Sequence, residues 1–311
     1  MDDKVPIAFL DSTIFEVEKY LRQKKDKLES INYIYCLDKK GVLKGAVSIK
    51  EVFRQGKQRK LEEFIEGKAV AVSPYTEAEK VANLALKNNI KSIPVVNKNG
   101  EFLGVVLSDT ILEIAYREIE EDISLLAGIE LPENIKDINS ISIFASLKHR
   151  LPWLIIGMFG GFIMSKTINS FEATLANNLI LASFIPLIVY MGSAVQTQIG
   201  YFIVRDLAFN PKINFFKYAF RQFGVVSLIG LGIALIAFFS SFLFYANLII
   251  SLILTLAMFL GILSSIITGV FIPYIFHRLK FDPASASGPI ATILQDLISI
   301  AIYLFVAQAL C

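Results

Sequence analysis

The sequence has few of the side chains that usually carry catalysis. Its 311 residues include two histidines and two cysteines, and neither pair has the spacing of a zinc site. Cys36 and Cys311 lie in opposite halves of the chain, so we expect no disulfide. No Ser/His/Asp or Cys/His set is recognisable, and no glycine-rich phosphate loop ends in Lys-Ser/Thr. We therefore expect neither an enzyme nor an ATP-driven pump.

Charge is scarce in the second half of the chain. Of the 28 Asp and Glu residues, 24 fall in residues 1–150, and of the 30 Lys and Arg residues, 23 do. This division predicts a soluble domain followed by a membrane domain. No basic segment interleaved with aromatic residues argues for nucleic acid as a partner. Residues 1–10 have an acidic start and no long apolar run, so no cleaved signal peptide is expected and the first half should stay in the cytoplasm.

The first half contains one pattern twice. Three turn positions recur with the same offset of 59 residues: Asp38 and Asn97, Gly41 and Gly100, Gly45 and Gly104. An equal offset at three turns indicates an internal repeat. Each copy is predicted as two strands joined by an Asp/Asn-x-x-Gly turn, with helices at residues 14–27, 50–54, 77–87 and 110–121. The unit resembles a CBS domain, so residues 1–129 are predicted to form an α/β tandem CBS pair.

CBS pairs often bind adenine nucleotides, and the resemblance implies where a site would lie. The usual pattern is Gly-x-x-Ser/Thr-x-x-Asp, with the acid on the ribose hydroxyls. The first copy offers Ser48 and Glu51 at these positions, whereas the second has Leu107 and Thr110 and lacks the acid. ATP or another adenine nucleotide is therefore a candidate ligand of the first copy only.

Four acids crowd the end of the soluble half: Glu118, Glu120, Glu121 and Asp122. They form either a solvated helix end or a weak site for a hard divalent cation, which would cancel their repulsion. Residues 130–150 follow as a connector with acids early and bases late. Within it, residues 138–147 are amphipathic enough to lie along a membrane surface or over a pore mouth.

Five apolar segments predict five membrane helices, at residues 153–167, 175–204, 223–245, 248–276 and 286–310. The loops after the second and fourth spans carry Lys and Arg, whereas the opposite loops carry none. By the positive-inside rule the basic loops are cytoplasmic. This orientation puts the CBS half in the cytoplasm and Cys311 outside the plasma membrane.

The last span carries a carboxylate, Asp296, followed by a charge-free stretch to Leu310. A carboxylate at that depth costs about 2.5–3.5 kcal/mol on insertion scales, so we expect it to face a bundle interior or a watery path. Thr292 lies one turn earlier on the same face. These oxygens suit a hard cation such as Mg²⁺, although Ca²⁺, Mn²⁺, Na⁺ and H⁺ stay open. A protonated or hydrogen-bonded structural Asp is the alternative.

The second span carries Gln196 and Gln198, which lie two apart and therefore on different helix faces. At most one is expected to face a central path, and the other should bond a neighbouring helix. Hydroxylic and small residues at 264–269 are expected to serve packing first and a path second.

The order of these parts resembles the MgtE family of magnesium channels and transporters over about residues 10–310. The resemblance is carried by the linker at 118–128, the stretches 192–198 and 204–208, and a last-span motif: Asp282-Pro283-Ala284, Pro289, Ala291-Thr292 and Asp296. It implies a homodimer with a pore between the two membrane halves, in which Asp296 coordinates hydrated Mg²⁺. The implied pore candidates are Asp296, Thr292, Ala291, Gly192, Gln198 and Gln196.

The resemblance also implies regulation by Mg²⁺. Ions between acidic cytosolic surfaces would hold a plug helix, here residues 131–150, against the pore. The implied regulatory candidates are Glu118, Glu120, Glu121, Asp122, Asp137 and Asp282. Three features depart from the family: no helical domain precedes the CBS pair in this sequence, Ala194 replaces an Asn, and Gly288 replaces an Asn. The first is expected to weaken or retune gating, and the other two affect selectivity.

The prediction is therefore a five-helix membrane protein with a cytosolic CBS pair: residues 1–129, a connector at 130–150, and a pore domain at 151–311. Its expected function is passive Mg²⁺ flow through a dimeric pore in the lipid bilayer, gated by Mg²⁺. Two alternatives stay open. One is transport of another cation, by Mn²⁺ or Ca²⁺ flow or Na⁺-coupled exchange, and the other is a membrane-bound sensor with a vestigial pore.

Overall fold

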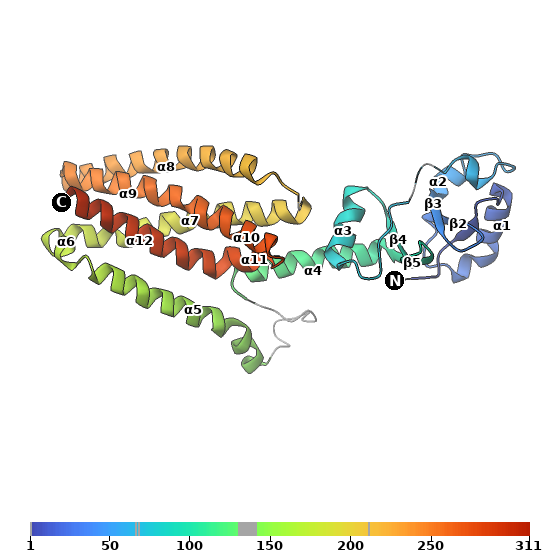
Figure 1. Cartoon of the computed structure of the whole chain (residues 1–311), viewed down its shortest axis with the longest axis horizontal. Coiled ribbons are helices and arrows are strands. Elements are labelled where there is room, and N and C mark those ends of the chain that lie inside the picture. Colours follow the sequence, from blue (N-terminus) through green and yellow to red (C-terminus); the bar gives the residue numbers. More distant parts are fainter. Residues whose placement is uncertain (1, 66, 68, 130–141, 211) are drawn as a thin grey trace. The chain divides into compact units, whose positions relative to one another are not determined.

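The computed structural model describes residues 2–65, 67, 69–129, 142–210 and 212–311. The chain divides into two compact units, Met1–Ile119 and Glu120–Cys311. The first unit combines strands and helices, and the second is helical throughout its described part (Figure 1).

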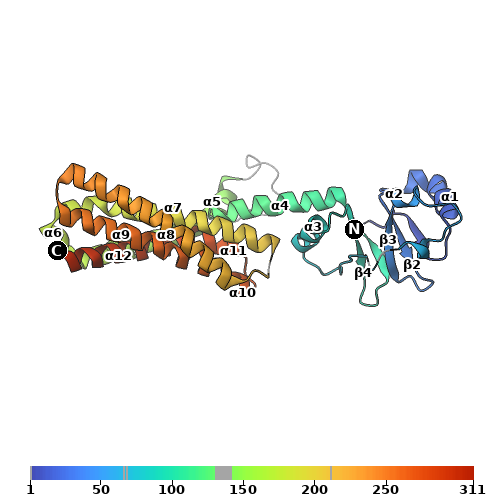
Figure 2. The ribbon, with the colours of Figure 1, turned by 90° about the horizontal axis from the view of Figure 1, so that it is seen from above.

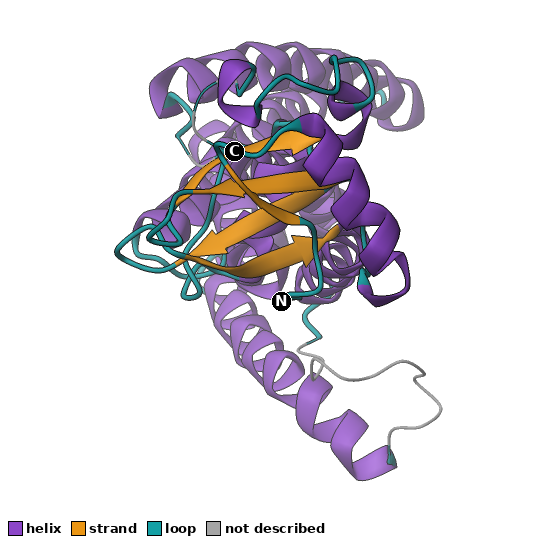
Figure 3. Ribbon diagram, turned by 90° about the vertical axis from the view of Figure 1, so that its right-hand side faces the viewer, coloured by secondary structure: helices purple, strands orange, loops and turns teal. Residues whose placement is uncertain are grey.

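The first unit contains the two copies of the repeat (Figure 3). In the first copy β1 (Ile7–Phe9) pairs parallel with β2 (Tyr33–Leu37), which pairs antiparallel with β3 (Leu43–Ser48). In the second copy β4 (Ser92–Val96) pairs antiparallel with β5 (Phe102–Leu107). Strands β4 and β5 begin and end 59 residues after β2 and β3, which confirms the repeat.

Helices flank these strands where the sequence predicts them. They are α1 (Ile14–Lys24) with η1 (Lys25–Lys27), α2 (Ile49–Val52), η2 (Leu61–Glu63), α3 (Ala78–Lys87) and α4 (Ser108–Leu126). Helix α4 is longer than expected and runs from the first unit into the second. Each copy has its own apolar core, formed in the first around Ile14 and Ile34 and in the second around Val81 and Ile93.

Each hairpin turn is closed by the Asp or Asn that begins it. Asp38 Oδ1 accepts hydrogen bonds from the backbone N–H groups two and four residues on, at 2.8 and 3.0 Å, and Asn97 Oδ1 does the same at 2.9 and 3.0 Å. Gly41 and Gly100 have φ angles of +77° and +82°, which glycine adopts without a Cβ clash. The repeated sequence pattern therefore produces two turns that are closed by the same side-chain hydrogen bonds and the same glycine conformation.

The two hairpin turns also pair with each other. Leu43 N donates to Gly100 O, and Phe102 N donates to Gly41 O, both at 3.0 Å. The Tyr35 ring, almost fully buried, stacks on the Phe102 ring with centroids 5.2 Å apart. Backbone and aromatic contacts thus join the two copies into one unit.

Cys36 in β2 reports whether the first unit is folded. Burial raises the pKa of its thiol to about 12, and the thiolate is the reactive form, so we expect thiol reagents to spare Cys36 in the native protein. Cys311 is exposed and should react. Mass spectrometry before and after denaturation checks this prediction. A Cys311→Ser variant should show no native labelling, and equal labelling rates at both thiols would contradict the expectation.

The second unit is a helical bundle (Figure 2). Its elements are α5 (Ile143–Asn169), α6 (Glu172–Asn177), α7 (Leu179–Phe209), α8 (Phe215–Tyr245), α9 (Leu248–Ile266), η4 (Ile267–Phe271), α10 (Ile272–Arg278), α11 (Pro283–Ser285), η5 (Ala286–Ile290) and α12 (Ala291–Leu310). They provide five segments long and apolar enough to cross a membrane: residues 143–169, 179–209, 215–245, 248–278 and 283–310. The five-span prediction is confirmed.

The first span differs in length from its prediction. Helix α5 begins at Ile143 and continues through Pro152, so residues 143–150, assigned to the connector, belong to the same helix as the span. The N-terminal cap of α5 is Ser142, whose side chain accepts from Ala145 N at 3.2 Å. The earlier connector residues 130–141 lie outside the described residues, and the connector as a separate domain stays a prediction.

The bundle core lies where α12 packs against α7 and α9. Ile199 and Ile203 of α7, Leu254 and Ile262 of α9, and Leu304 of α12 are nearly or fully buried in one apolar cluster. Helix α8 covers α9 and leaves large phenylalanines exposed on its other side, as suits a helix facing lipid. This packing brings the polar residues of α7 and α12 together at one seam.

Candidate cation site

The last span is broken before its acidic residue. Gly288, inside η5, has non-helical backbone angles of φ −78° and ψ −124°, and Pro289 follows it. Proline lacks the N–H that would donate the next hydrogen bond of the helix, so a break in the helix is expected at Pro289. Thr292 Oγ1 donates to Gly288 O at 3.2 Å and so gives this carbonyl a partner beyond the break.

Asp296 lies one turn after Thr292, at the seam between α12 and α7. Its Oδ1 accepts a hydrogen bond from Ser193 Oγ of α7, and both side chains are partly buried. The acid singled out by the sequence therefore has a polar partner from the second span. Ser193 was not among the predicted site residues. Its position inside the polar stretch at 192–198 is the sequence signal that points to it.

Gln196 and Gln198 lie on different sides of α7, as their spacing predicts. Gln196 is fully buried and donates from Nε2 to Ser287 O at 3.3 Å. Its Oε1 lies 3.4 Å from Thr292 Oγ1, whose single proton is shared between this oxygen and Gly288 O. Gln198 is exposed on the bundle surface. Gln196 is therefore the amide that ties α7 to the start of the last span.

Gly192 and Ala291, both predicted pore residues, are buried packing positions in this chain. A Cβ at Gly192 would overlap Ser299 Oγ and lie 3.0 Å from Gln295 Nε2. The missing side chain thus allows α7 to approach α12 closely. Ala291 is fully buried at the first position of α12. A role for their backbones in binding an ion stays a prediction.

Gln295, the neighbour of Asp296, was missed by the sequence analysis. Its amide is fully buried. Nε2, which carries two protons, lies within hydrogen-bond distance of Gly261 O at 3.1 Å, Ser264 Oγ at 3.0 Å and Ser299 Oγ at 2.9 Å, and Oε1 accepts from Thr268 Oγ1 at 2.5 Å. Three of the partners lie on the fourth span, so the amide fixes how α12 faces α9. A polar amide directly beside the acid in an otherwise apolar span is the signal that was available.

A second helix irregularity lies next to these amides. The π-helical turn η4 interrupts the fourth span between α9 and α10. Within it, a Cβ at Gly269 would lie 2.9 Å from Gln196 O, so α7 and η4 are in close contact. Such turns inside helices are frequent at functional sites. The π-helical turn of the fourth span and the break of the fifth therefore both lie beside the buried Gln196.

The end of α4 packs on the break before α12, inside the second unit. A Cβ at Gly128 would lie 2.5 Å from Pro289 Cγ, and one at Gly288 would lie 2.7 Å from Leu125 O. Gly128 also has a φ of +72°, which disfavours other residues. The segment that follows the acidic linker thus contacts the entry of the last span directly.

The predicted regulatory acids do not gather into a metal site within the described chain. Among the residues that the structure places, no group of three or more His, Cys, Asp or Glu is positioned to hold a metal ion. Glu118, Glu120, Glu121 and Asp122 lie along α4, and Asp282 Oδ1 accepts from Ala284 N at 2.8 Å and caps α11. Asp137 lies outside the described residues. A regulatory site made by these acids stays a prediction.

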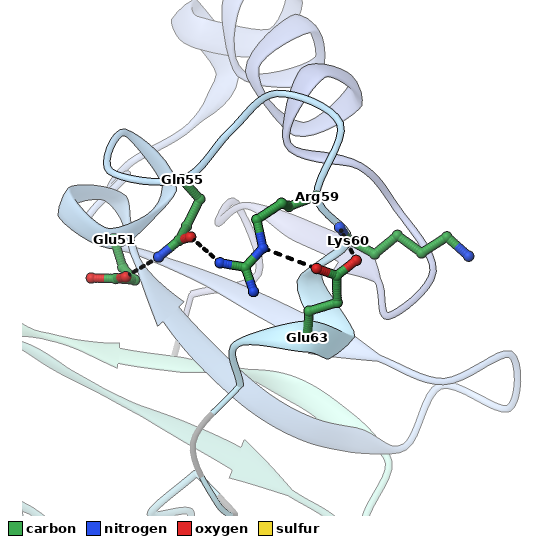
Figure 4. A network of polar contacts seen from close by, with 5 residues as sticks. All are labelled: Glu51, Gln55, Arg59, Lys60 and Glu63. Carbon is green, nitrogen blue, oxygen red and sulfur yellow. Dashed lines mark hydrogen bonds and ion pairs between the residues drawn. The ribbon is translucent and has the colours of Figure 1, made fainter.

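The predicted nucleotide residues are engaged within the first CBS copy. Ser48 Oγ accepts from Glu51 N at 3.2 Å and caps α2. The Glu51 carboxylate accepts from Gln55 Nε2, which begins a chain of contacts through Arg59 to Glu63 (Figure 4). A ribose would therefore compete with Gln55 for this carboxylate.

Comparisons with known proteins agree with the two-part organisation. Residues 185–306 match the family model of MgtE, described as a divalent cation transporter, and residues 61–117 match that of the CBS domain. Two relatives, each named magnesium transporter MgtE, come from Bacillus subtilis and Thermus thermophilus. They are 30% and 28% identical to this chain over 284 and 301 residues.

The matched relatives are longer than this chain. The alignments cover 90% and 96% of this chain but 62% and 66% of the two relatives, so the chain spans less than two thirds of their length. One solved structure, the cytosolic domain of the Mg²⁺ channel MgtE in complex with ATP, is 31% identical. The match covers 36% of this chain and 45% of that chain, with a TM-score of 0.35.

Proposed function

Because this chain carries a membrane domain of the MgtE family and a CBS domain, we propose that it is a channel-like transporter for Mg²⁺. The ion flows passively down its electrochemical gradient. The observation that carries the proposal is the Asp296 carboxylate, held by Ser193 at the seam between α7 and α12 of a multi-pass membrane protein. No catalytic step is involved.

The chemistry of the seam suits a hydrated divalent cation. Mg²⁺ gives up its waters reluctantly and is bound by few carboxylates, with water filling the other positions. Asp296 supplies negative charge, and Ser193 and Thr292 supply neutral hydroxyl oxygens. Such a site binds strongly enough to attract the ion and weakly enough to release it.

We propose that the transporter is a homodimer whose second copy completes the path. Asp296 of α12 and Ser193 of α7 are only partly buried, and Thr197 and Gln198 of α7 are exposed. Polar and ionised side chains on the outer surface of a membrane bundle are costly in lipid. A second copy covering this seam removes that cost and brings a second Asp296 to the pathway.

Regulation in this proposal comes from the cytoplasm, where the CBS unit lies, with Cys311 on the opposite side. Mg²⁺ bound by the acids Glu118, Glu120, Glu121 and Asp122, together with Asp137 and Asp282, closes the path when cytosolic Mg²⁺ is high. The contact of Gly128 with Pro289 supports this coupling, because it places the end of the acidic segment against the break before α12. An adenine nucleotide at Ser48 and Glu51 would be a second regulatory ligand.

One observation favours a second candidate, transport of another cation on the same scaffold. Ala194 provides no side-chain oxygen where the family pattern has Asn. A hydrated ion thus meets one ligand fewer on this side of the pathway, so Mn²⁺, Ca²⁺ or Na⁺ are the competing substrates. Selectivity must therefore be measured together with Mg²⁺ flux.

Flux into liposomes that contain the purified protein tests the proposal. At low Mg²⁺ on the CBS side, an imposed Mg²⁺ gradient alone should drive uptake above that of protein-free liposomes. Raising Mg²⁺ on the CBS side should stop it, and competition by Ca²⁺, Mn²⁺ and Na⁺ gives the selectivity. A folded dimer that shows no uptake contradicts transport, and a ligand-dependent change in the CBS unit would then favour a sensor.

A further inference from the structure

We propose that Ser193 is a second oxygen donor of the cation site and determines its selectivity. The inference rests on the proposed transport function and extends it to a residue that the sequence motif did not identify. The Ser193 hydroxyl and the Asp296 carboxylate form one site from two helices, α7 and α12. In this site the hydroxyl holds the carboxylate in place and shares the hydrated cation with it.

The hydrogen bond leaves both partners able to bind further. Ser193 Oγ donates its single proton to Asp296 Oδ1, so its lone pairs stay available as acceptors. Asp296 keeps its second oxygen, Oδ2, outside this bond. Both side chains are partly buried, so the pair is reachable from the bundle surface. The pair therefore offers two further acceptor oxygens at the seam, one from each helix.

Neighbouring contacts fix the geometry of the pair. Gly192 precedes Ser193 and allows α7 to lie against Ser299 and Gln295 of α12. Gln295 precedes Asp296 and bonds the fourth span, which sets the rotation of α12 about its axis. Gly192 and Gln295 are thus packing residues. Each fixes the direction of the site residue that follows it, Ser193 on α7 or Asp296 on α12.

A hydroxyl–carboxylate pair of this kind favours a cation that keeps its waters. Waters bound to Mg²⁺ can donate to Oδ2 of Asp296 and to Ser193 Oγ at the same time, without direct coordination. Ca²⁺ takes six to eight flexible oxygen ligands and loses water more readily, so it gains more from a mobile carboxylate. Removing the hydroxyl frees the carboxylate and should therefore reduce discrimination against Ca²⁺.

The test uses three variants of the full chain in liposomes. Ser193→Ala should lower the ratio of Mg²⁺ to Ca²⁺ transport about tenfold, the size expected for one hydrogen bond to a charged group. Ser193→Thr keeps the hydroxyl and should retain the ratio within about twofold, since only a methyl group is added. Ser183→Ala is the matched control, because Ser183 lies on the same helix and its hydroxyl donates to Ile180 O of that helix, at 2.7 Å.

Equilibrium binding of Mn²⁺ alone, followed by electron paramagnetic resonance in detergent, gives a readout independent of flux. The Mn²⁺ signal that Asp296→Asn removes is the signal of this site, and Ser193→Ala should weaken it. Absence of flux in the wild type contradicts the proposed transport, while Mn²⁺ binding still decides the role of Ser193. Flux with an unchanged ion ratio and unchanged Mn²⁺ binding in Ser193→Ala overturns the inference.

Discussion

Asp296→Asn is expected to lower Mg²⁺ flux by about 100-fold or more. Substitutions of groups that only support metal ligands cost about 10–100-fold, so loss of the charged ligand itself should reach at least the upper end of that range. Asparagine keeps the shape of aspartate, and its Oδ1 still accepts the hydrogen bond from Ser193. The loss therefore comes from charge and not from geometry.

Stability should move in the opposite direction to flux in this variant. A partly buried carboxylate in a membrane span is costly, and an amide removes that cost, so the melting temperature should stay the same or rise. Glu172→Gln is the matched control, because it removes an exposed carboxylate at the start of α6 and should retain flux. A folded Asp296→Asn protein with wild-type flux would mean that the acid is structural and that the path lies elsewhere.

Gln295→Leu is expected to destabilise the bundle strongly and to reduce flux with it. Leucine fills a similar volume but loses three bonds to the fourth span, to Gly261, Ser264 and Thr268. Interhelical hydrogen bonds in membranes contribute about 0.6–2 kcal/mol each, so the loss of three should cost roughly 2–6 kcal/mol. Flux falls in addition because α12 is no longer held in the rotation that aims Asp296 at Ser193.

Thermal unfolding in detergent and flux in liposomes measure the two parts of this prediction. Gln308→Leu is the matched control, because Gln308 lies on the same helix and is exposed. It should change neither the melting temperature nor flux appreciably. An unchanged melting temperature in Gln295→Leu would show that the buried amide contributes no net stability, and that the orientation of α12 has another cause.

The sequence predicted the features that depend on periodicity and on charge. Equal spacing at three turns revealed the repeat, and the strands that form it show the same offset of 59 residues. Long charge-free runs revealed the five spans. The spacing of Gln196 and Gln198 predicted that they face different ways, because helix geometry alone decides that. These are properties of single segments and need no knowledge of neighbours.

The contacts that build the site could not be read in the same way. The bond from Ser193 to Asp296 joins residues 103 positions apart, and it depends on how closely α7 approaches α12. That approach depends on Gly192, which the motif suggested as a pore residue and which serves packing here. The length of α5 was underestimated because Pro152 and the charged residues before it obscured a continuous helix.

The paired hairpin turns of the CBS unit have a consequence for its folding. Leu43 and Phe102 donate across the copies to Gly100 and Gly41, so neither turn can move away from the other without breaking the two bonds that join them. Segments that open together behave as one cooperative unit in hydrogen exchange. The backbone amides of both turns should therefore share a single opening free energy, and a ligand bound to one copy would slow exchange in both.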